Sequence, residues 1–180
     1  INIVFIGSLS KGFNFKPVAK AAKMFAENNA NLRFIICGSG EEMNNIKGLF
    51  DGLNNTVFPG WVNEQNLQTI CEMSMLAIAP YMSLEDFKIS IPNKIYDYLY
   101  FSLPILTSLE GETKSFVEKN NVGNFYEASK ENDLYKKILK IKNNHKTYEI
   151  MKNNCKKMAK EFSGDLIYQK IVDKLNTISG

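Results

Sequence analysis

The sequence contains very little arginine and histidine, which are the residues that many catalytic and nucleic-acid sites use. Among its 180 residues there is one arginine, Arg33, and one histidine, His145. A single arginine leaves almost no bidentate guanidinium contact to bases, and the formal net charge is only +3, so we predict no nucleic-acid partner. His145 lies in the polar stretch KNNHKTY, which is typical of a solvated helix, so we expect no Ser–His or Cys–His pair.

Cysteine is also scarce and scattered. The three cysteines, Cys37, Cys71 and Cys155, are far apart, and no two of them form a CxxC pair. This usage is typical of a reducing compartment and of a protein without a cysteine metal site, so we expect a cytoplasmic protein with no bound metal. Cys37 lies in an apolar run and is predicted to be a small core residue.

Long hydrophobic runs are absent as well. No stretch of about 18 or more apolar residues is present, so no transmembrane helix is predicted, and no signal peptide is recognisable. The chain begins with Ile1 rather than Met, and we expect it to be a piece of a longer protein. Since 44% of the residues are hydrophobic, the 180 residues suit one domain (1–180) with a proper core.

What the sequence does contain is a regular alternation of short apolar runs and helical patterns. The predicted strands cover 2–7, 32–38, 56–60, 75–81, 104–108 and 123–127. The predicted helices cover 15–27, 41–50, 63–74, 92–101 and 113–120. Strands that are apolar on both faces indicate a sheet covered on both sides. The predicted fold is therefore α/β, a doubly wound Rossmann-like parallel sheet of about six strands with helices on both faces.

From about residue 130 the strand pattern stops, and 130–180 is predicted to be a helical C-terminal segment. Residues 163–177 suggest its third helix. The first two helices are marked by apolar stripes, namely Leu134, Ile138 and Ile141, and then Tyr148, Met151, Cys155, Met158 and Phe162.

In such a sheet, ligands bind at the carboxyl ends of the strands. Glu127 is the only acid at these predicted ends, which disfavours a receiver-type phosphoacceptor domain. The stretch CGSGEE resembles the start of a dinucleotide fingerprint, but Met43 occupies the place of the third glycine. NAD binding is therefore disfavoured, and Gly38 and Gly40 are expected to form a tight turn between a strand and a helix.

The stretch SIPNKIYDYLYFSLPIL, residues 90–106, predicts a helix start that could hold an anion. Pro92 fits the first helical position, so the N–H groups of Asn93 and Lys94 would point outward at the positive end of the helix dipole. Asp97 lies one turn further, about 6 Å along the axis, and a carboxylate can accept hydrogen bonds from two neighbouring ribose hydroxyls. The alternative is that Asp97 is simply a favourable charge near a helix start.

Four stretches together are similar to the C-terminal domain of B-fold glycosyltransferases, especially family 4. They are FIGSLSKGFNF, LRFIICGSGEE, VFPGWVNEQNLQTICEMSMLAIAPY and SIPNKIYDYLYFSLPILTSLEGETKSFVEKNNVGNFYE, which together span about residues 2–127. The resemblance implies a domain that binds a nucleotide-sugar donor, most simply a UDP-sugar, without a cofactor. It also implies an N-terminal acceptor domain that is absent from this chain.

The resemblance further implies roles for individual residues. Asp97, where Glu is usual, would hold the ribose, the helix start at 92–94 would take the diphosphate, and the turn 59–62 would lie against the base. Lys11 matches a phosphate-binding lysine, whereas Ser8 occupies a position where the family usually has arginine. The implied donor-binding set is Gly7, Ser8, Lys11, Gly38, Gly60, Trp61, Val62, Ser90, Pro92, Asn93, Lys94 and Asp97.

The residue pattern leaves the catalytic group unassigned. The family's paired acids are eight residues apart, and eight before Asp97 stands Ile89, so the first acid is absent or replaced by Glu85 or Asp86. Some bacterial sugar transferases of surface polysaccharide synthesis resemble this shorter PNKxYxYL version. The resemblance therefore implies a transferase of that kind.

Other interpretations of single residues stay open at this point. Lys11 could be a solvated loop lysine, and Trp61 could be a core or rim aromatic rather than a platform for the base. Of Tyr96, Tyr98 and Tyr100, two are expected to be packing residues.

Two other functions also stay open. Half of a nucleotide-sugar epimerase would need acids and histidines in its cleft. A non-catalytic interaction domain on the same fold would explain Ser8 and Ile89.

Residues 130–162 carry ten lysines and four acids, which predicts a basic helical cover whose lysines are solvated. The alternative is contact with the inner face of an anionic membrane that bears a lipid-linked acceptor.

Overall fold

The computed structural model of the chain describes residues 1–28, 30–130 and 132–162. The predicted helix over 163–177 lies outside these residues.

The described residues form one sheet of six strands in the order β3-β2-β1-β4-β5-β6. Every adjacent pair of strands is parallel. The strands are β1 (Asn2–Ile6), β2 (Arg33–Cys37), β3 (Thr56–Gly60), β4 (Ser74–Ala79), β5 (Ile105–Thr107) and β6 (Gly123–Phe125). Each lies where an apolar run predicted it, so the predicted α/β class and the doubly wound parallel sheet are confirmed.

The helices connect these strands and continue beyond the sheet. They are α1 (Lys16–Glu27), α2 (Met43–Gly48), α3 (Glu64–Glu72), α4 (Glu85–Lys88), α5 (Asn93–Tyr100), α6 (Glu112–Lys119), α7 (Asp133–Lys142) and α8 (His145–Glu161). Helix α4 is the one that the sequence did not predict. Asn63 caps α3 as predicted, because its side chain accepts a hydrogen bond from the N–H of Asn66 at 2.9 Å.

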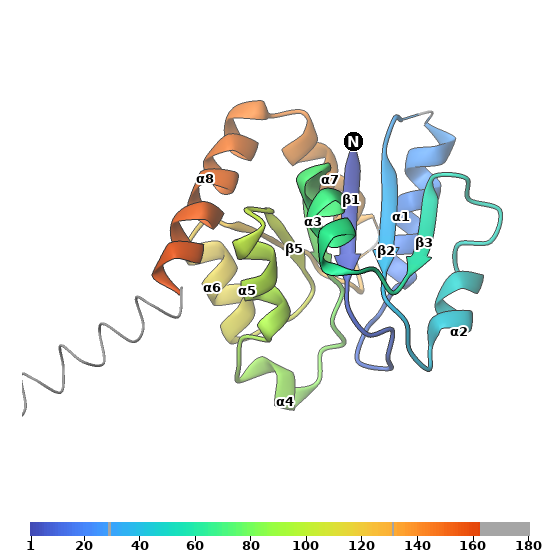
Figure 1. Cartoon of the computed structure of the whole chain (residues 1–180), viewed down its shortest axis with the longest axis horizontal. Helices are drawn as coiled ribbons and strands as arrows, with labels where there is room; N and C mark the ends of the chain where they lie inside the picture. The colour runs from blue at the N-terminus through green and yellow to red at the C-terminus, as the bar shows by residue number, and fades with distance from the viewer. Residues whose placement is uncertain (29, 131, 163–180) are drawn as a thin grey trace, which may run out of the picture.

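Two hydrophobic cores lie on the two faces of the sheet, as the alternation of side chains along β1 illustrates. Ile3 and Phe5 point into the core that α1 and α7 cover, whereas Val4 points into the core that α3, α5 and α8 cover. Figure 1 shows α3 and α5 in front of the sheet and α7 behind it. Both faces of the central strands β1 and β4 are therefore buried, which is why their sequences are almost continuously apolar. The edge strand β3 is only partly buried.

The C-terminal helices belong to these same two layers. Helix α7 contacts α1 and helix α8 contacts α5. The stripe of Leu134, Ile138 and Ile141 is buried on α7, and Met151 and Cys155 are buried on α8. The predicted packing of the two apolar stripes on the domain is confirmed.

The strand order places a topological switch point between β1 and β4. The chain moves from β1 to β2 on one side, then crosses back to β4 on the other. The carboxyl ends of all strands meet at one edge of the sheet, which is the lower edge in Figure 1, where α4 lies. Ligands of open parallel sheets bind at this edge, beside the switch point.

Close packing of two loops explains the glycines of CGSGEE. A side chain on Gly38 would meet the backbone of Gly7, and a side chain on Gly40 would meet the backbone of Leu9. The N–H of Leu9 donates to the carbonyl of Ser39 at 2.9 Å, so the loops after β1 and β2 are hydrogen-bonded to each other. The prediction that these glycines form a tight turn is confirmed, because only glycine leaves room for the neighbouring backbone.

Candidate functional site

A cavity of about 440 Å³ lies at the carboxyl ends of β1, β2 and β3. Its lining comes from the three strand ends and from the start of α3. Five of the predicted donor-binding residues are part of it. The lining residues are Ile6, Gly7, Ser8, Cys37, Gly38, Ser39, Trp61, Val62 and Leu67.

Backbone hydrogen bonds hold the three strand ends together. The N–H of Gly7 donates to the carbonyl of Cys37 at 3.0 Å, and the N–H of Gly38 donates to the carbonyl of Gly60 at 2.7 Å. Gly7 and Gly38 both have positive φ, at 141° and 133°. Because neither residue carries a side chain, this wall of the cavity is backbone, and a ligand could approach it closely.

Trp61 and Val62, just after β3, are also part of the lining. Trp61 is 78% exposed, so it is a rim aromatic and not a core residue. Val62 is half-buried. An exposed indole beside a cavity offers a flat apolar surface on which a planar ring can stack.

The side chain of Lys94 lies against the end of β1, which the sequence reasoning had not foreseen. Its Nζ donates a hydrogen bond to the carbonyl of Ile6. It also lies 4.4 Å from the ring centroid of Phe5 and 5.3 Å from that of Phe13. Burial lowers the pKa of Lys94 to about 8, and the charge of Asp97 opposes this shift.

The start of α5 differs by one residue from the prediction. Pro92 has φ −62° and ψ 146° and is extended, so it precedes the first helical residue, Asn93. The predicted place of Pro92 at the first helical position is wrong, because the fixed φ of proline fits both an extended and a helical residue. Among the described residues, no group accepts a hydrogen bond from the N–H of Asn93 or Lys94, so the predicted free donors are present.

Asp97 lies one turn after Lys94 on α5 and is exposed. Burial of part of the carboxyl group raises its pKa, and the charge of Lys94 opposes the shift. The pKa of Tyr81 is raised mainly by burial of its hydroxyl, and the negative charge of Asp97 is the second, smaller cause. No described group donates a hydrogen bond to this carboxylate, so its oxygens are available to hydroxyl groups.

The three tyrosines of α5 have different environments. Tyr98 is fully buried and Tyr100 is 76% exposed. Tyr96 packs edge-on against Phe162, with 5.0 Å between the ring centroids. Two of the three are therefore packing residues, as expected.

The remaining predicted residues do not line the 440 Å³ cavity. Six of them, Gly60, Ser90, Pro92, Asn93, Lys94 and Asp97, lie outside its lining. The carbonyl of Ser90 accepts a hydrogen bond from Thr113 Oγ1 at 3.1 Å, which ties the loop before α5 to α6.

Lys11 is exposed and lines a separate cavity of about 390 Å³, together with Phe13 and Glu42 among others. The structure therefore leaves both interpretations of Lys11 open, since an exposed loop lysine can be solvated or can reach a ligand.

The candidates for the first acid lie on or beside α4. Lys88 Nζ pairs with Glu85 at 2.9 Å and with Glu110 at 3.2 Å. Ile89 is 80% exposed. Glu85 is therefore held in an ion-pair cluster at the surface, while Asp86 is exposed.

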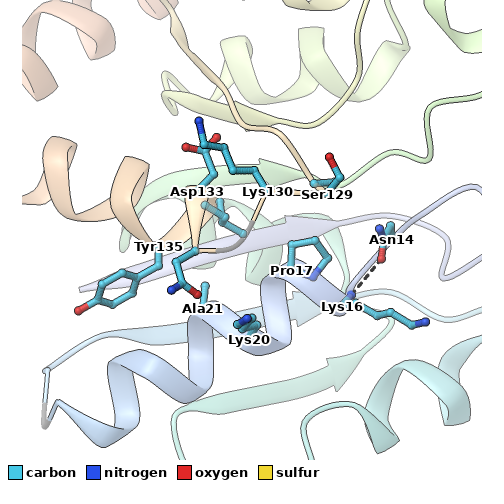
Figure 2. A pocket seen from close by; sticks show the side chains of 12 residues that line it. Asn14, Lys16, Pro17, Lys20, Ala21, Ser129, Lys130, Asp133 and Tyr135 are labelled. Carbon is cyan, nitrogen blue, oxygen red and sulfur yellow. Dashed lines mark hydrogen bonds between the residues drawn. The ribbon is translucent and has the colours of Figure 1, made fainter.

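A further cavity of about 270 Å³ lies between the start of α1 and the loop after β6. Lys16, Lys20, Lys130 and Asp133 are among its lining residues. Figure 2 shows Lys16 and Lys130 pointing to opposite sides, and the N–H of Lys16 donates to Asn14 Oδ1 at 3.2 Å. None of the predicted site residues lines this cavity.

The described residues offer neither a metal site nor a membrane-spanning helix. No group of three or more His, Cys, Asp or Glu side chains among them could hold a metal ion. None of the helices found there is long and apolar enough to cross a membrane. His145 is exposed at the first position of α8, next to the capping Asn144.

The parallel sheet and the helices that cover it define a Rossmann-like domain, with a cavity at the carboxyl ends of β1, β2 and β3. Residues 1–158 match the profile of the family described as Glycosyl transferases group 1. The chain belongs to this family and is a glycosyltransferase domain. A search of curated protein sequences found no significant match.

Solved structures of glycosyltransferases share this fold. The catalytic domain of cholesterol-α-glucosyltransferase from Helicobacter pylori is 20% identical, with a TM-score of 0.73, and 91% of this chain matches 99% of that one. Anabaena Alr3699/HepE, solved with UDP and glucose, is 16% identical with a TM-score of 0.76. TarM from S. aureus, solved with UDP, is 18% identical with a TM-score of 0.74.

This chain spans only part of two of these proteins. It covers 48% of the HepE chain and 34% of the TarM chain, whereas 98% and 96% of its own length is matched. The predicted identity as a C-terminal domain of a B-fold glycosyltransferase is confirmed. The closer resemblance to family 4 stays a prediction.

Proposed function

We propose that this domain binds the nucleotide-sugar donor of a glycosyltransferase, and that the donor is a UDP-sugar. The observation that carries the proposal is the 440 Å³ cavity, because five of the donor-binding residues that the family resemblance implies line it together. Its position at the carboxyl ends of the strands is where such sheets bind nucleotides. The UDP that accompanies HepE and TarM in their structures makes uridine the first nucleotide to test.

The diphosphate would lie between the backbone wall at Gly7 and the start of α5. The free N–H groups of Asn93 and Lys94 and the dipole of α5 favour an anion there. Charge that develops on the departing nucleoside diphosphate would be stabilised by the same groups, with Lys11 as a further cation and with no metal required. Ser8 and Ser90 would complete the polar surroundings.

The nucleoside would extend from the phosphates into the cavity, with the base inside it and the ribose at its edge, beside Asp97. The base would stack on or beside Trp61 and Val62, with Gly60 setting the turn that presents them. Asp97 would accept hydrogen bonds from the two ribose hydroxyls, since its carboxylate has no donor among the described residues. Gly38 would let the ligand approach the end of β2.

The acceptor would be bound by a separate N-terminal domain, and the isolated 180 residues would not transfer sugar alone. The whole enzyme would serve synthesis of a surface polysaccharide or glycoconjugate, and a lipid-linked acceptor would bring it to the inner face of the membrane. The exposed side of α8, with Lys146, Lys152, Lys156 and Lys157, is the surface that supports this membrane contact.

Thermal unfolding with added nucleotides tests the donor assignment. UDP and UDP-glucose should raise the melting temperature, and a ligand at 100 times its dissociation constant should add about 2.7 kcal/mol of stability. NAD serves as the control, because the glycine turn lacks the features of a dinucleotide site. If NAD raises the melting temperature and no nucleoside diphosphate does, the donor assignment is wrong.

A nucleotide-binding domain without catalytic activity is the second candidate. It is favoured by Ile89, which stands where the family has an acid, and by the pairing of Glu85 with Lys88. Asp86 is then the exposed acid that remains as a candidate for the first acid. Slow hydrolysis of a UDP-sugar by the full-length protein would exclude it. The epimerase alternative is disfavoured, because the cavity lining contains no acid and no histidine.

A further inference from the structure

Lys94 is a mostly buried cation at the switch point of the sheet. Its Nζ contacts the carbonyl of Ile6 and lies over the rings of Phe5 and Phe13, at 4.4 and 5.3 Å from their centroids. It comes from the second residue of α5, whereas Phe5 and Ile6 belong to β1. The side chain therefore links the start of α5 to the carboxyl end of β1.

This cation has no carboxylate partner at ion-pair distance among the described residues. Asp97 is the charged group that faces it from its own helix, and it acts on Lys94 only at longer range. From β1 and the following loop, Lys94 is faced by two phenyl rings and one neutral carbonyl. Burying an ammonium group without a nearby negative charge costs free energy, and the lowered pKa of Lys94 has the same cause.

Gly7 makes the room for the end of this side chain. A side chain on Gly7 would meet the Nζ of Lys94. Ile6 and Gly7 also line the 440 Å³ cavity, so the ammonium lies next to two residues of its backbone wall. The absence of a side chain at Gly7 therefore leaves room for the ammonium of Lys94 and also keeps the cavity wall free of a side chain.

The cavity itself has no charged side chain in its lining. Lys11 is exposed and lines a different cavity. The only arginine, Arg33, begins β2 and pairs in register with Asn2, so it lies at the amino edge of the sheet. A phosphate group in the cavity would therefore find its nearest buried counter-charge in Lys94.

We propose that Lys94 rests against Gly7 and Ile6 in the free protein and exchanges the Ile6 carbonyl for a phosphate oxygen when a nucleoside diphosphate enters the cavity. This rests on the proposed function. The flexible four-carbon stem of lysine allows the ammonium to move by a rotamer change. The exchange replaces a neutral acceptor by a charged one, which makes a shorter and stronger hydrogen bond. The phosphate would thus bind to an ammonium group that already lies next to the cavity in the free protein.

Titration of UDP and uridine into wild type and Lys94→Met tests the role of the ammonium. Loss of one charge-assisted hydrogen bond should weaken UDP binding about 10- to 100-fold, while uridine binding should change less than threefold. Lys114→Met is the matched control, because Lys114 Nζ also lies over a phenyl ring, 4.3 Å from the centroid of Phe125, on helix α6. Lys114→Met should bind both compounds as the wild type does.

Lys94→Arg tests whether a positive charge at this position is sufficient or whether the shape and mobility of the lysine side chain are also needed. It keeps the charge but cannot reproduce the fit of the slender ammonium behind Gly7, so we expect UDP affinity between those of wild type and Lys94→Met. If Lys94→Met keeps the wild-type ratio of UDP to uridine affinity, the inference is overturned while the proposed function stands. If UDP does not bind the wild type at all, both are overturned.

The wild-type protein offers a second measurement that does not depend on any variant. NMR titration of the lysine Cε and Nζ signals, with Lys94 assigned from its loss in Lys94→Met, should show a Lys94 pKa near 8 in the free protein. Addition of UDP should raise it by at least one unit, because a phosphate favours the charged form. An unchanged pKa with UDP bound would overturn the exchange.

Discussion

The hydroxyl of Tyr98 donates a hydrogen bond to the carbonyl of Ile78 at 3.0 Å. The same hydroxyl accepts a hydrogen bond from the N–H of Ile6 at 3.2 Å. Regular pairing of β1 with β4 ends at Val4 and Ala77. Beyond this point the hydroxyl of Tyr98 links the two strands by hydrogen bonds to both. One buried phenol thereby joins both strands of the switch point to α5, the helix that carries Lys94 and Asp97.

Removing this hydroxyl should destabilise the domain. Tyr98→Phe leaves the N–H of Ile6 and the carbonyl of Ile78 without their shared partner, which should lower the free energy of unfolding by about 1–3 kcal/mol. Urea unfolding followed by circular dichroism measures the change. Tyr100→Phe is the matched control, since Tyr100 is 76% exposed and should change stability by less than about 0.5 kcal/mol. Equal stability of the two variants would show that the bridge contributes nothing.

Asp97 should contribute to nucleotide affinity and not to the fold. Two charge-assisted hydrogen bonds to ribose, partly offset by desolvation of the carboxylate, predict that Asp97→Ala weakens UDP binding by about 2–4 kcal/mol. This corresponds to roughly 30- to 1000-fold in affinity. Asp97→Glu should have a milder effect, because it keeps the carboxylate.

Calorimetric titration of UDP into the wild type and both Asp97 variants measures the difference, with circular dichroism as the control for folding. Should Asp97→Ala bind UDP as tightly as the wild type while staying folded, Asp97 is only a favourable charge near a helix start.

The buried Lys94 predicts a dependence of stability on pH. Its pKa in the folded protein is about 8, against an ordinary value of 10.5. Between these two values the unfolded chain binds more protons than the folded one, so the contribution of Lys94 to stability rises with pH across this window. Below pH 8 the folded protein carries the full cost of the buried charge, about 3 kcal/mol.

Comparison of wild type with Lys94→Met isolates this contribution, because the other titrating groups are common to both proteins. The difference in unfolding free energy, Lys94→Met minus wild type, should fall by about 2–3 kcal/mol as the pH rises from 7 to 10.5. A difference that is constant with pH would mean that Lys94 keeps its ordinary pKa in the folded protein.

The basic side of α8 should bind anionic vesicles if the whole protein works at a membrane. Polybasic segments gain about 1 kcal/mol per lysine near an anionic surface. Lys156→Glu combined with Lys157→Glu should therefore reduce sedimentation with phosphatidylserine vesicles. Lys23→Glu combined with Lys47→Glu changes the net charge equally on α1 and α2 and is the control. Sedimentation that does not depend on anionic lipid content would mean that the lysines are simply solvated.

Much of the fold could be predicted from the sequence, because its elements are defined by local patterns. Each strand is a short apolar run, which is most completely buried in the central strands β1, β4 and β5, and the glycines of CGSGEE mark a turn that only glycine permits. Helix α4 was missed because its four residues are too few for a helical period to appear. Pro92 was misplaced by one residue, since its φ alone does not distinguish the last extended residue from the first helical one.

The candidate site could be predicted only in part, for a related reason. Local sequence identified the start of α5, the acid at Asp97 and the turn before Trp61. It did not indicate that Lys94 turns its side chain back onto Ile6, a residue 88 positions earlier in the chain. It also did not indicate that Lys11 and Trp61 line different cavities.

The sequence by itself therefore determined which segments are strands and helices, because the spacing of apolar residues along a segment indicates which of the two it forms. The tertiary structure decided what meets at the site. The order β3-β2-β1-β4-β5-β6 brings Gly7, Gly38 and Trp61 to one edge. The packing of α5 against the sheet brings Lys94 next to Ile6 and Gly7. These contacts depend on strand order and on the direction of single side chains, and no local pattern encodes either.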